Sequence, residues 1–224
     1  MDSIVISIGG SVLLSNEADI NFLKNFSEFL IKFSGKYRIF LVVGGGRVAR
    51  DYIKKGRELS IEEHDLDKLG IAITRVNASL LTNILKISNK EIPLNTDDAA
   101  KLSNQIVVMG GTIPGHSTDL VGAELAQKTH SRLFIIATNV DGIYDKDPNK
   151  YSDAKQLKTV HIEDLIKQYG INWNSAGSNA VVDGPALKKI QDSQIQTIVL
   201  NGKKLDQLEN AILNKPINGT IIKI

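Results

Sequence analysis

Three glycine-rich turns, each following a short apolar run, carry the residues of this sequence that are best suited to chemistry. Glycine lets the backbone turn sharply and present its N–H groups, and a helix that begins at such a turn adds a positive dipole end and unpaired donors. Both features suit phosphate, and three turns indicate a site for more than one phosphate group. The turns are Gly9-Gly10-Ser11 after Ile4–Ile8, Gly44-Gly45-Gly46 after Arg38–Val43, and Gly110-Gly111-Thr112 after Ile106–Met109.

The second turn gives the strongest signal, because the helical segment behind it carries Arg47 and Arg50. A basic residue at a helix start is normally unfavourable, since it meets the positive end of the dipole. A bound anion would remove that conflict for Arg47. Two simpler interpretations stay open: a single glycine turn after a strand is more often a tight connection than a ligand site, and Arg47 can be a solvated surface residue.

Two further segments are rich in small polar groups. Residues 110–119 read GGTIPGHSTD, which suits recognition of a phosphate or a flat polar ring, although the hydroxyl groups can instead simply cap the next helix. His116 is either a general base or a hydrogen-bonding loop histidine. Residues 138–148 read TNVDGIYDKDP. Their three aspartates do not have the spacing of a calcium-binding loop, and a polar turn is the simpler interpretation.

The composition excludes several classes of function. The chain of 224 residues has ordinary apolar (42%) and charged (23%) fractions and a net charge of +2, too small and too scattered to favour nucleic acid. It has no cysteine, which excludes disulfides, thiol catalysis and cysteine zinc sites. No apolar stretch approaches the length of a membrane span, and Asp2 argues against a signal peptide. We therefore expect a cytoplasmic protein with no nucleic-acid or membrane partner.

Short β-branched runs alternate with helical patterns, which predicts a mainly parallel α/β sheet. Such sheets bind ligands at the carboxyl ends of their strands, where the glycine turns lie. The predicted strands are Ile4–Ile8, Arg38–Val43, Ile106–Met109, Leu133–Ala137, Gln196–Leu200 and a closing segment, Gly219–Ile222. The predicted helices are Ile20–Phe33, Arg47–Gly56, Leu66–Ile87, Asp119–Lys128, Ile162–Tyr169, Pro185–Ser193 and Leu205–Leu213.

The common nucleotide-binding motifs fit this chain poorly. Residues 44–49 match the relaxed dinucleotide pattern G-x-G-x-x-A, which is a weak signal alone. A Rossmann domain also needs an acidic residue at the end of a second strand about 20 positions on, whereas Glu62 and Glu63 lead into a helical pattern. Hydride transfer is therefore disfavoured. The Walker sequence and the protein-kinase glycine loop with its catalytic set are absent.

The motifs IGGSVL, VVGGGRVARDY, MGGTIPGHSTD and TNVDGIYDKDP, in this order, resemble the amino-acid kinase superfamily, and within it most closely the archaeal-type uridylate kinases. The resemblance runs from about Ile4 to Ile222. It implies a three-layer α/β sandwich with a central, mostly parallel eight-stranded sheet, built as one domain over residues 1–224. It also implies transfer of the γ-phosphoryl group of ATP, with Mg²⁺, to UMP. A homohexamer is implied as well.

Carried over by position, the resemblance implies an acceptor half towards the N-terminus and an ATP half towards the C-terminus. UMP would be bound by Gly45, by Asp67 at its ribose, and by Thr112, Ile113, Pro114, Gly115, His116, Ser117 and Thr118. ATP would be bound by Gly10, Ser11, Gly46, Arg50, Thr138, Asn139, Tyr144 and Asp147. The transfer itself would be assisted by Arg47, Arg50, Asp119 and Lys188. No side chain is assigned as a metal ligand.

One position departs from the superfamily pattern. Many members have a phosphate-bridging lysine two residues before the first glycine turn, where this chain has Ser7. Archaeal uridylate kinases also lack that lysine, so the gap fits the narrower resemblance, and Arg47, Arg50 and Lys188 are our hypothesis for the compensating charge. Two alternatives remain: another small-molecule kinase such as isopentenyl phosphate kinase, and a relative that binds nucleotide or oxyanion without turnover.

Overall fold

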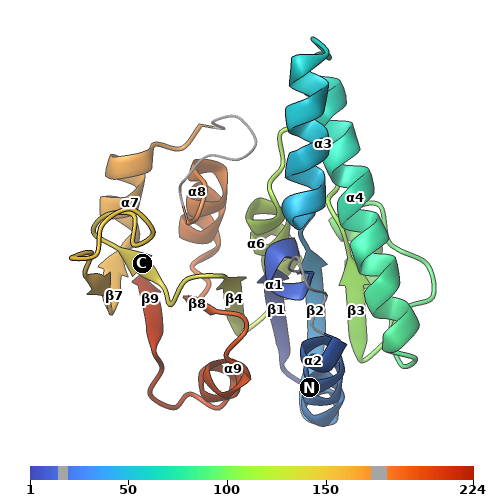
Figure 1. Ribbon diagram of the computed structural model, residues 1–224. Helices are drawn as coiled ribbons and strands as arrows, with labels where there is room; N and C mark the ends of the chain where they lie inside the picture. The colour runs from blue at the N-terminus through green and yellow to red at the C-terminus, as the bar shows by residue number, and fades with distance from the viewer. Residues whose placement is uncertain (15–19, 173–180) are drawn as a thin grey trace.

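The computed structural model describes residues 1–14, 20–172 and 181–224 of the chain. Within these residues, one sheet has seven strands in the order β3-β2-β1-β4-β8-β9-β7, and β5 pairs with β6 separately (Figure 1). Neighbouring strands of the large sheet are parallel except for β8 and β9. The strands are β1 (Ser3–Ile8), β2 (Arg38–Val43), β3 (Ile106–Met109), β4 (Leu133–Thr138), β5 (Ile143–Tyr144), β6 (Gln156–Leu157), β7 (Thr159–His161), β8 (Thr197–Asn201) and β9 (Gly219–Lys223).

The mostly parallel α/β sheet predicted from the sequence is confirmed. All six predicted strands are present, and their ends differ from the prediction by at most one residue. The expected count of eight strands is wrong for the described residues, because β5 and β6 pair with each other and do not join the large sheet. The interior strand β1 is buried along its whole length, which explains why its sequence is an unbroken apolar and small-residue run.

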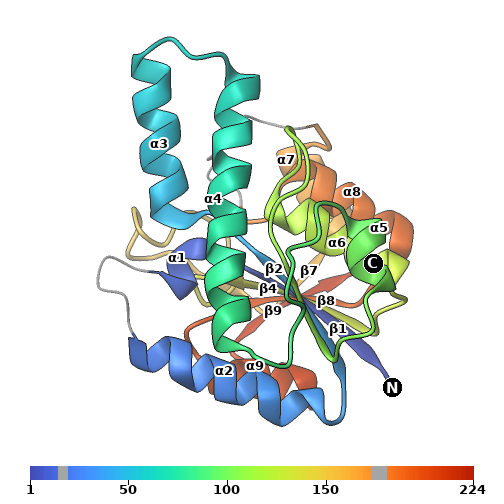
Figure 2. The same cartoon turned by 90° about the vertical axis from the view of Figure 1, so that its right-hand side faces the viewer.

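Helices cover both faces of the sheet, giving three layers (Figure 2). The residues of β1 alternate between the two faces, as strand geometry requires. Ile4, Ile6 and Ile8 join a cluster with Phe26, Leu30, Leu81 and Leu208, whereas Val5 joins a second cluster with Leu125, Leu165 and Leu187. Among the described residues, three helices cover the first cluster: α2 (Ile20–Ser34), the later part of α4 (Glu63–Ile84) and α9 (Leu205–Ile212). Four helices of the described chain cover the second cluster: α5 (Thr96–Lys101), α6 (Thr118–Lys128), α7 (Ile162–Tyr169) and α8 (Gly184–Ser193).

Two helices extend the molecule beyond the carboxyl ends of the strands. The helix α3 (Gly46–Glu58) starts at the second glycine turn and forms an antiparallel pair with α4 that projects past the sheet (Figure 1). The short helix α1 (Gly10–Leu13) starts inside the first glycine turn. The hydroxyl oxygen of Ser117, just after the third turn, accepts a hydrogen bond from the backbone N–H of Leu120 and so caps α6. Each turn therefore leads into a helix at the same end of the sheet, directly or within a few residues.

The predicted helices are all present, but α4 is shifted. It runs from Glu63 to Ile84 rather than from Leu66 to Ile87, because Glu63 and Asp65 can occupy the first turn near the positive dipole end and the helix closes at Leu85. In the described part of the chain, no helix combines the length and the apolar character needed to cross a membrane.

Candidate active site

The first and second glycine turns are interlocked at the carboxyl ends of β1 and β2. A Cβ atom added to Gly10 would lie 2.4 Å from the carbonyl oxygen of Gly44 and 2.4 Å from the nitrogen of Gly46. Gly46 has φ +66°, a conformation that favours glycine. The side-chain amide of Asn77 on α4 donates to the carbonyl oxygen of Gly44 at 2.9 Å. Only residues without side chains allow the two backbones to approach this closely, so the turns form one surface.

The third turn is attached to α4. The backbone N–H of Gly111 donates to Thr74 Oγ1 at 2.6 Å, and the guanidinium of Arg75 donates to the carbonyl oxygens of Gly111 (3.2 Å) and Thr112 (3.0 Å). Further along, the N–H of Gly115 donates to Asp67 Oδ2 at 2.8 Å. Because Asp67 and Arg75 lie two turns apart on one helix, α4 holds the loop at both ends.

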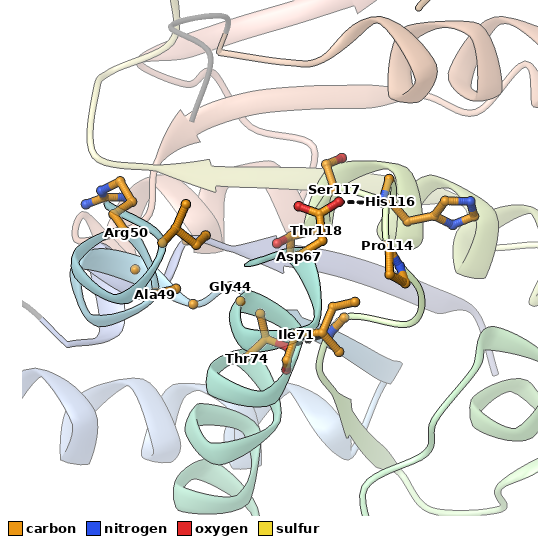
Figure 3. A pocket seen from close by; sticks show the side chains of 18 of the residues that line it. Gly44, Ala49, Arg50, Asp67, Ile71, Thr74, Pro114, His116, Ser117 and Thr118 are labelled. Carbon is orange, nitrogen blue, oxygen red and sulfur yellow. Dashed lines mark hydrogen bonds between the residues drawn. The ribbon is translucent and has the colours of Figure 1, made fainter. Parts of the chain in front are cut away.

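A cavity of about 290 Å³ lies between the three turns, α3 and α4. Arg50 is at one side of it and Pro114 and His116 are at the other, with Asp67 between them (Figure 3). The wall includes most of the residues predicted for the acceptor and for the donor phosphates: Gly10, Ser11, Gly45, Gly46, Arg50, Asp67, Ile113, Pro114, Gly115, His116, Ser117 and Thr118. Sequence positions spread over more than 100 residues thus meet in one cavity.

A second cavity, of about 400 Å³, opens beyond the end of β4. Its wall includes the four residues predicted for the adenosine side of ATP, namely Thr138, Asn139, Tyr144 and Asp147. The first turn lies against the same strand, because the N–H of Gly9 donates to the carbonyl oxygen of Ala137 at 3.0 Å. The first glycine turn is therefore part of the wall of the first cavity and is hydrogen-bonded to the strand that leads into the second.

Comparison with known proteins agrees with this arrangement. The family model described as "Amino acid kinase family" matches residues 2–201. The chain belongs to the amino acid kinase family. It is 40% identical over 222 residues to a uridylate kinase of Methanobrevibacter smithii and 42% identical over 224 residues to one of Methanococcus vannielii, with 98% of each chain covered in both cases.

Solved structures of amino acid kinase relatives have the same fold. The crystal structure of uridylate kinase from Archaeoglobus fulgidus matches with a TM-score of 0.86 and 38% sequence identity, covering 99% of this chain and 100% of that one. The UMP kinase from Ureaplasma parvum matches with a TM-score of 0.80 and 25% identity, covering 100% of this chain and 99% of that one.

In this member of the amino acid kinase family, Asp119 lies directly behind the first turn. Ser7 Oγ, two residues before Gly9, donates to Asp119 Oδ1 at 2.6 Å. The residue as a whole is only half-buried, but its carboxyl group lies deep between α6 and β1. Burial raises the pKa of Asp119 to about 7, the hydrogen bond from Ser7 opposes that rise, and the nearby carboxylate of Asp183 adds to it. The group therefore changes charge near neutral pH.

The other residues predicted to assist the transfer are less clustered. Arg47 is exposed and its Nε lies 3.3 Å from Asp51 Oδ2. Lys188 is exposed on α8 and its Nζ lies 2.7 Å from Asp192 Oδ1. In the described part of the chain, neither belongs to the wall of the two cavities. Arg50 is the predicted cation that does.

Thr112 and His116 have polar atoms without partners. The hydroxyl oxygen of Thr112 and Nδ1 of His116 are buried and have no hydrogen-bond partner among the described residues. Nδ1 of His116 lies 3.9 Å from Glu124 Oε1, too far for a hydrogen bond. Buried polar atoms of this kind are normally paired. Of these two described residues, His116 belongs to the wall of the first cavity, whereas Thr112, predicted to bind UMP, does not.

Sequence reasoning missed two residues that hold the site together, Arg75 and Asp183. Arg75 attaches α4 to the third glycine turn, and its local sequence is an ordinary helix. Asp183 accepts a hydrogen bond from Ser117 Oγ and caps α8 by accepting from the N–H of Ala186 at 3.0 Å. The order Asp183-Gly184-Pro185 is a helix-start signal that identifies the cap, but nothing local indicates its contact with Ser117.

Proposed function

We propose that this protein transfers the γ-phosphoryl group of ATP to UMP, forming UDP and ADP. The observation that carries the proposal is the pair of cavities at the carboxyl ends of the strands, one with the glycine turns in its wall and one beyond the end of β4, in a chain about 40% identical to uridylate kinases over nearly its whole length. Two cavities at the ends of the adjacent strands β1 and β4, with glycine turns in the wall of the first, suit two nucleotides whose phosphate groups must meet.

In this proposal each cavity binds one of the two nucleotides. UMP occupies the cavity beside α4, with its ribose at Asp67 and its uracil and phosphate along residues 112–118. The adenosine of ATP occupies the cavity beyond β4, with its phosphates over Gly10, Ser11 and Gly46. Arg50 reaches the phosphates from α3. Residues 1–224 thus act as one kinase domain in which the acceptor side is mainly N-terminal.

The chemistry needs charge neutralisation and alignment more than proton transfer. A phosphate monoester has its second pKa near about 6, so the attacking oxygen of UMP is already an anion at neutral pH and requires no general base. His116 is therefore a binding group in this proposal. The glycine N–H groups and Arg50 stabilise the developing charge, and Asp119 lies behind the first turn, where it orients basic groups at the transfer point.

We infer that Mg²⁺ accompanies ATP. Magnesium is usually held by one or two carboxylates, water and substrate phosphates rather than by a protein cage. We expect the phosphates of ATP and water to supply most of its ligands, since the described residues hold no group of three or more acidic, histidine or cysteine side chains suited to a metal. When bound, the ion would neutralise charge on the phosphate chain.

A coupled assay of ADP release tests the function. The protein is incubated with ATP, Mg²⁺ and one acceptor at a time: UMP, CMP, AMP or isopentenyl phosphate. We expect UMP to give the highest kcat/KM. Preference for isopentenyl phosphate would assign the alternative kinase activity, and nucleotide binding without ADP release with every acceptor would assign a non-catalytic role.

We also propose that the protein self-associates, as a homohexamer. A row of exposed apolar side chains follows the outer face of α4: Leu69, Val76, Leu80 and Ile84 are 37–63% exposed. Their spacing puts them on neighbouring turns, and such a surface suits a protein interface. Light scattering after size exclusion should give about 147 kDa, six times the 24.5 kDa of the chain, and Val76→Glu should lower that mass. A mass of one chain for the unaltered protein would contradict the proposal.

A further inference from the structure

Asp141 lies in the middle of the segment whose two ends form the wall of the second cavity. Thr138 and Asn139 precede it in that wall, and Tyr144 and Asp147 follow it. In the described part of the chain, Asp141 itself is outside the wall. Its side chain is 27% exposed, so the carboxylate is turned mostly towards protein.

The carboxylate of Asp141 joins three other segments of the chain. It accepts hydrogen bonds from Asn201 Nδ2 at the end of β8 (3.1 Å) and from Asn218 Nδ2 just before β9 (3.4 Å). The ammonium group of Lys204, at the start of α9, lies 2.8 Å from Oδ1 and 2.9 Å from Oδ2. The hydrogen bond from Lys204 is the largest of the effects that hold the pKa of Asp141 below its ordinary value. The group is therefore an anion at neutral pH.

The backbone around Asp141 is fixed as firmly as the side chain. Gln156 Nε2 donates to the carbonyl oxygen of Asp141 at 2.7 Å. Gly142 has φ +151°, and a Cβ atom there would lie 2.5 Å from Thr220 Oγ1. The N–H of Ile143 donates to that same hydroxyl oxygen at 2.8 Å. The chain thus changes direction immediately after Asp141, between the two parts of the cavity wall.

We propose that Asp141 is a positioning residue for the donor nucleotide: by tying the middle of residues 138–147 to β8, α9 and β9, its carboxylate sets the distance between the two walls of the second cavity. This inference rests on the proposed function, in which that cavity binds the adenosine of ATP. The carboxylate acts through the segment, without contact to the nucleotide. Its loss should weaken ATP binding and leave UMP binding unchanged.

The test uses Asp141→Asn, which keeps the shape of the side chain and removes the charge. Hydrogen bonds to a charged group are among the stronger ones, and we expect the KM for ATP and the Kd of a non-hydrolysable ATP analogue, measured by calorimetry, to rise about tenfold, equivalent to about 1.4 kcal/mol. The KM for UMP should stay within twofold. Glu209→Gln is the matched control, because it also removes a carboxylate paired with a lysine, Lys32 at 3.1 Å, but away from the cavity.

A double-mutant cycle with Lys204→Met tests the mechanism. If Lys204 acts by holding Asp141, its replacement should raise the Kd of the ATP analogue in the unaltered protein and have little further effect in Asp141→Asn. Should Asp141→Asn not fold, as judged by its thermal unfolding, Lys204→Met alone must still raise the KM for ATP and spare that for UMP.

Three results would overturn the inference: an unchanged Kd in Asp141→Asn, an equal rise in the constants for both nucleotides, or fully additive effects of the two substitutions. The calorimetric Kd requires no turnover. A protein that binds the ATP analogue but does not phosphorylate UMP would therefore count against the proposed function and leave the Asp141 inference open to its own test.

Discussion

Asp119 gives the most quantitative prediction, because its environment predicts a specific dependence of stability on pH. The pKa of Asp119 is about 7 in place of the ordinary 3.8. The folded protein therefore favours the protonated over the ionised form by about 4 kcal/mol more than the unfolded chain does, at 1.36 kcal/mol for each unit of pKa. The folded protein holds a proton on this carboxyl that the unfolded chain has released over that range. The free energy of unfolding attributable to Asp119 therefore falls as pH rises from about 4 and levels off above about 8.

The variant Asp119→Asn isolates this contribution, since an amide has nearly the same shape and does not titrate. Unfolding by denaturant is measured for both proteins, without nucleotide, from pH 4.5 to 8.5. We expect the stability of the variant relative to the unaltered protein to increase by about 3–4 kcal/mol across this range. The other acidic residues titrate in both proteins, so their effects cancel in the difference.

A second substitution checks the physical cause. The hydrogen bond from Ser7 favours the ionised form of Asp119, so in Ser7→Ala the pKa should move higher, and the stability should decline at a higher pH than in the unaltered protein. A stability difference between Asp119→Asn and the unaltered protein that does not change with pH would refute the account of Asp119 as a buried, ionisable group. A difference that decreases as pH rises would refute it as well.

Three further predictions concern the glycine turns and the acceptor cavity. Gly10→Ala places a Cβ atom 2.4 Å from backbone atoms of the second turn, so it should lower stability by about 1–3 kcal/mol and strongly reduce turnover. The control Gly35→Ala, with no atom within 4 Å of the new Cβ, should do neither. Equal effects of the two substitutions in stability and activity assays would be inconsistent with interlocked turns. Arg50→Ala should lower kcat by about 10²–10³, the scale for loss of one charge-stabilising donor, and unchanged turnover at saturating nucleotides would remove Arg50 from the mechanism. Asp67→Asn should chiefly raise the KM for UMP, and steady-state kinetics showing a loss confined to kcat would contradict a role in ribose binding.

The parts of the fold that were predictable from the sequence are those determined by local composition. The strands β1, β2 and β3 are continuous apolar runs because both faces of the sheet are covered, and α2 shows its buried side in the spacing of its phenylalanines. The strands β5, β6 and β7 contain two or three residues each. Their conformation depends on a partner strand, so no local pattern indicates them. The helix α1 begins with glycine, a poor helix former, and was missed for that reason.

The residues of the site were more predictable than their contacts. Glycine turns after apolar strands indicate the carboxyl edge of the sheet, because the close backbone approach there requires glycine. The strand order that brings the turns together is a tertiary property. Likewise, Ser7 and Asp119 are 112 positions apart, and Arg75 reaches a loop 36 positions away. Ser7 looked like a missing positive charge, whereas in the folded chain it is a hydrogen-bond donor to Asp119.

The measurement that tests the central claim most directly is a crystal structure with a bisubstrate analogue, in which adenosine and uridine are joined through five phosphate groups. Our account predicts uridine in the cavity between α4 and residues 112–118, adenosine in the cavity beyond β4, and the linking phosphates against the backbone N–H groups of the first two glycine turns. Phosphates bound away from those turns, or a nucleoside outside its cavity, would contradict it.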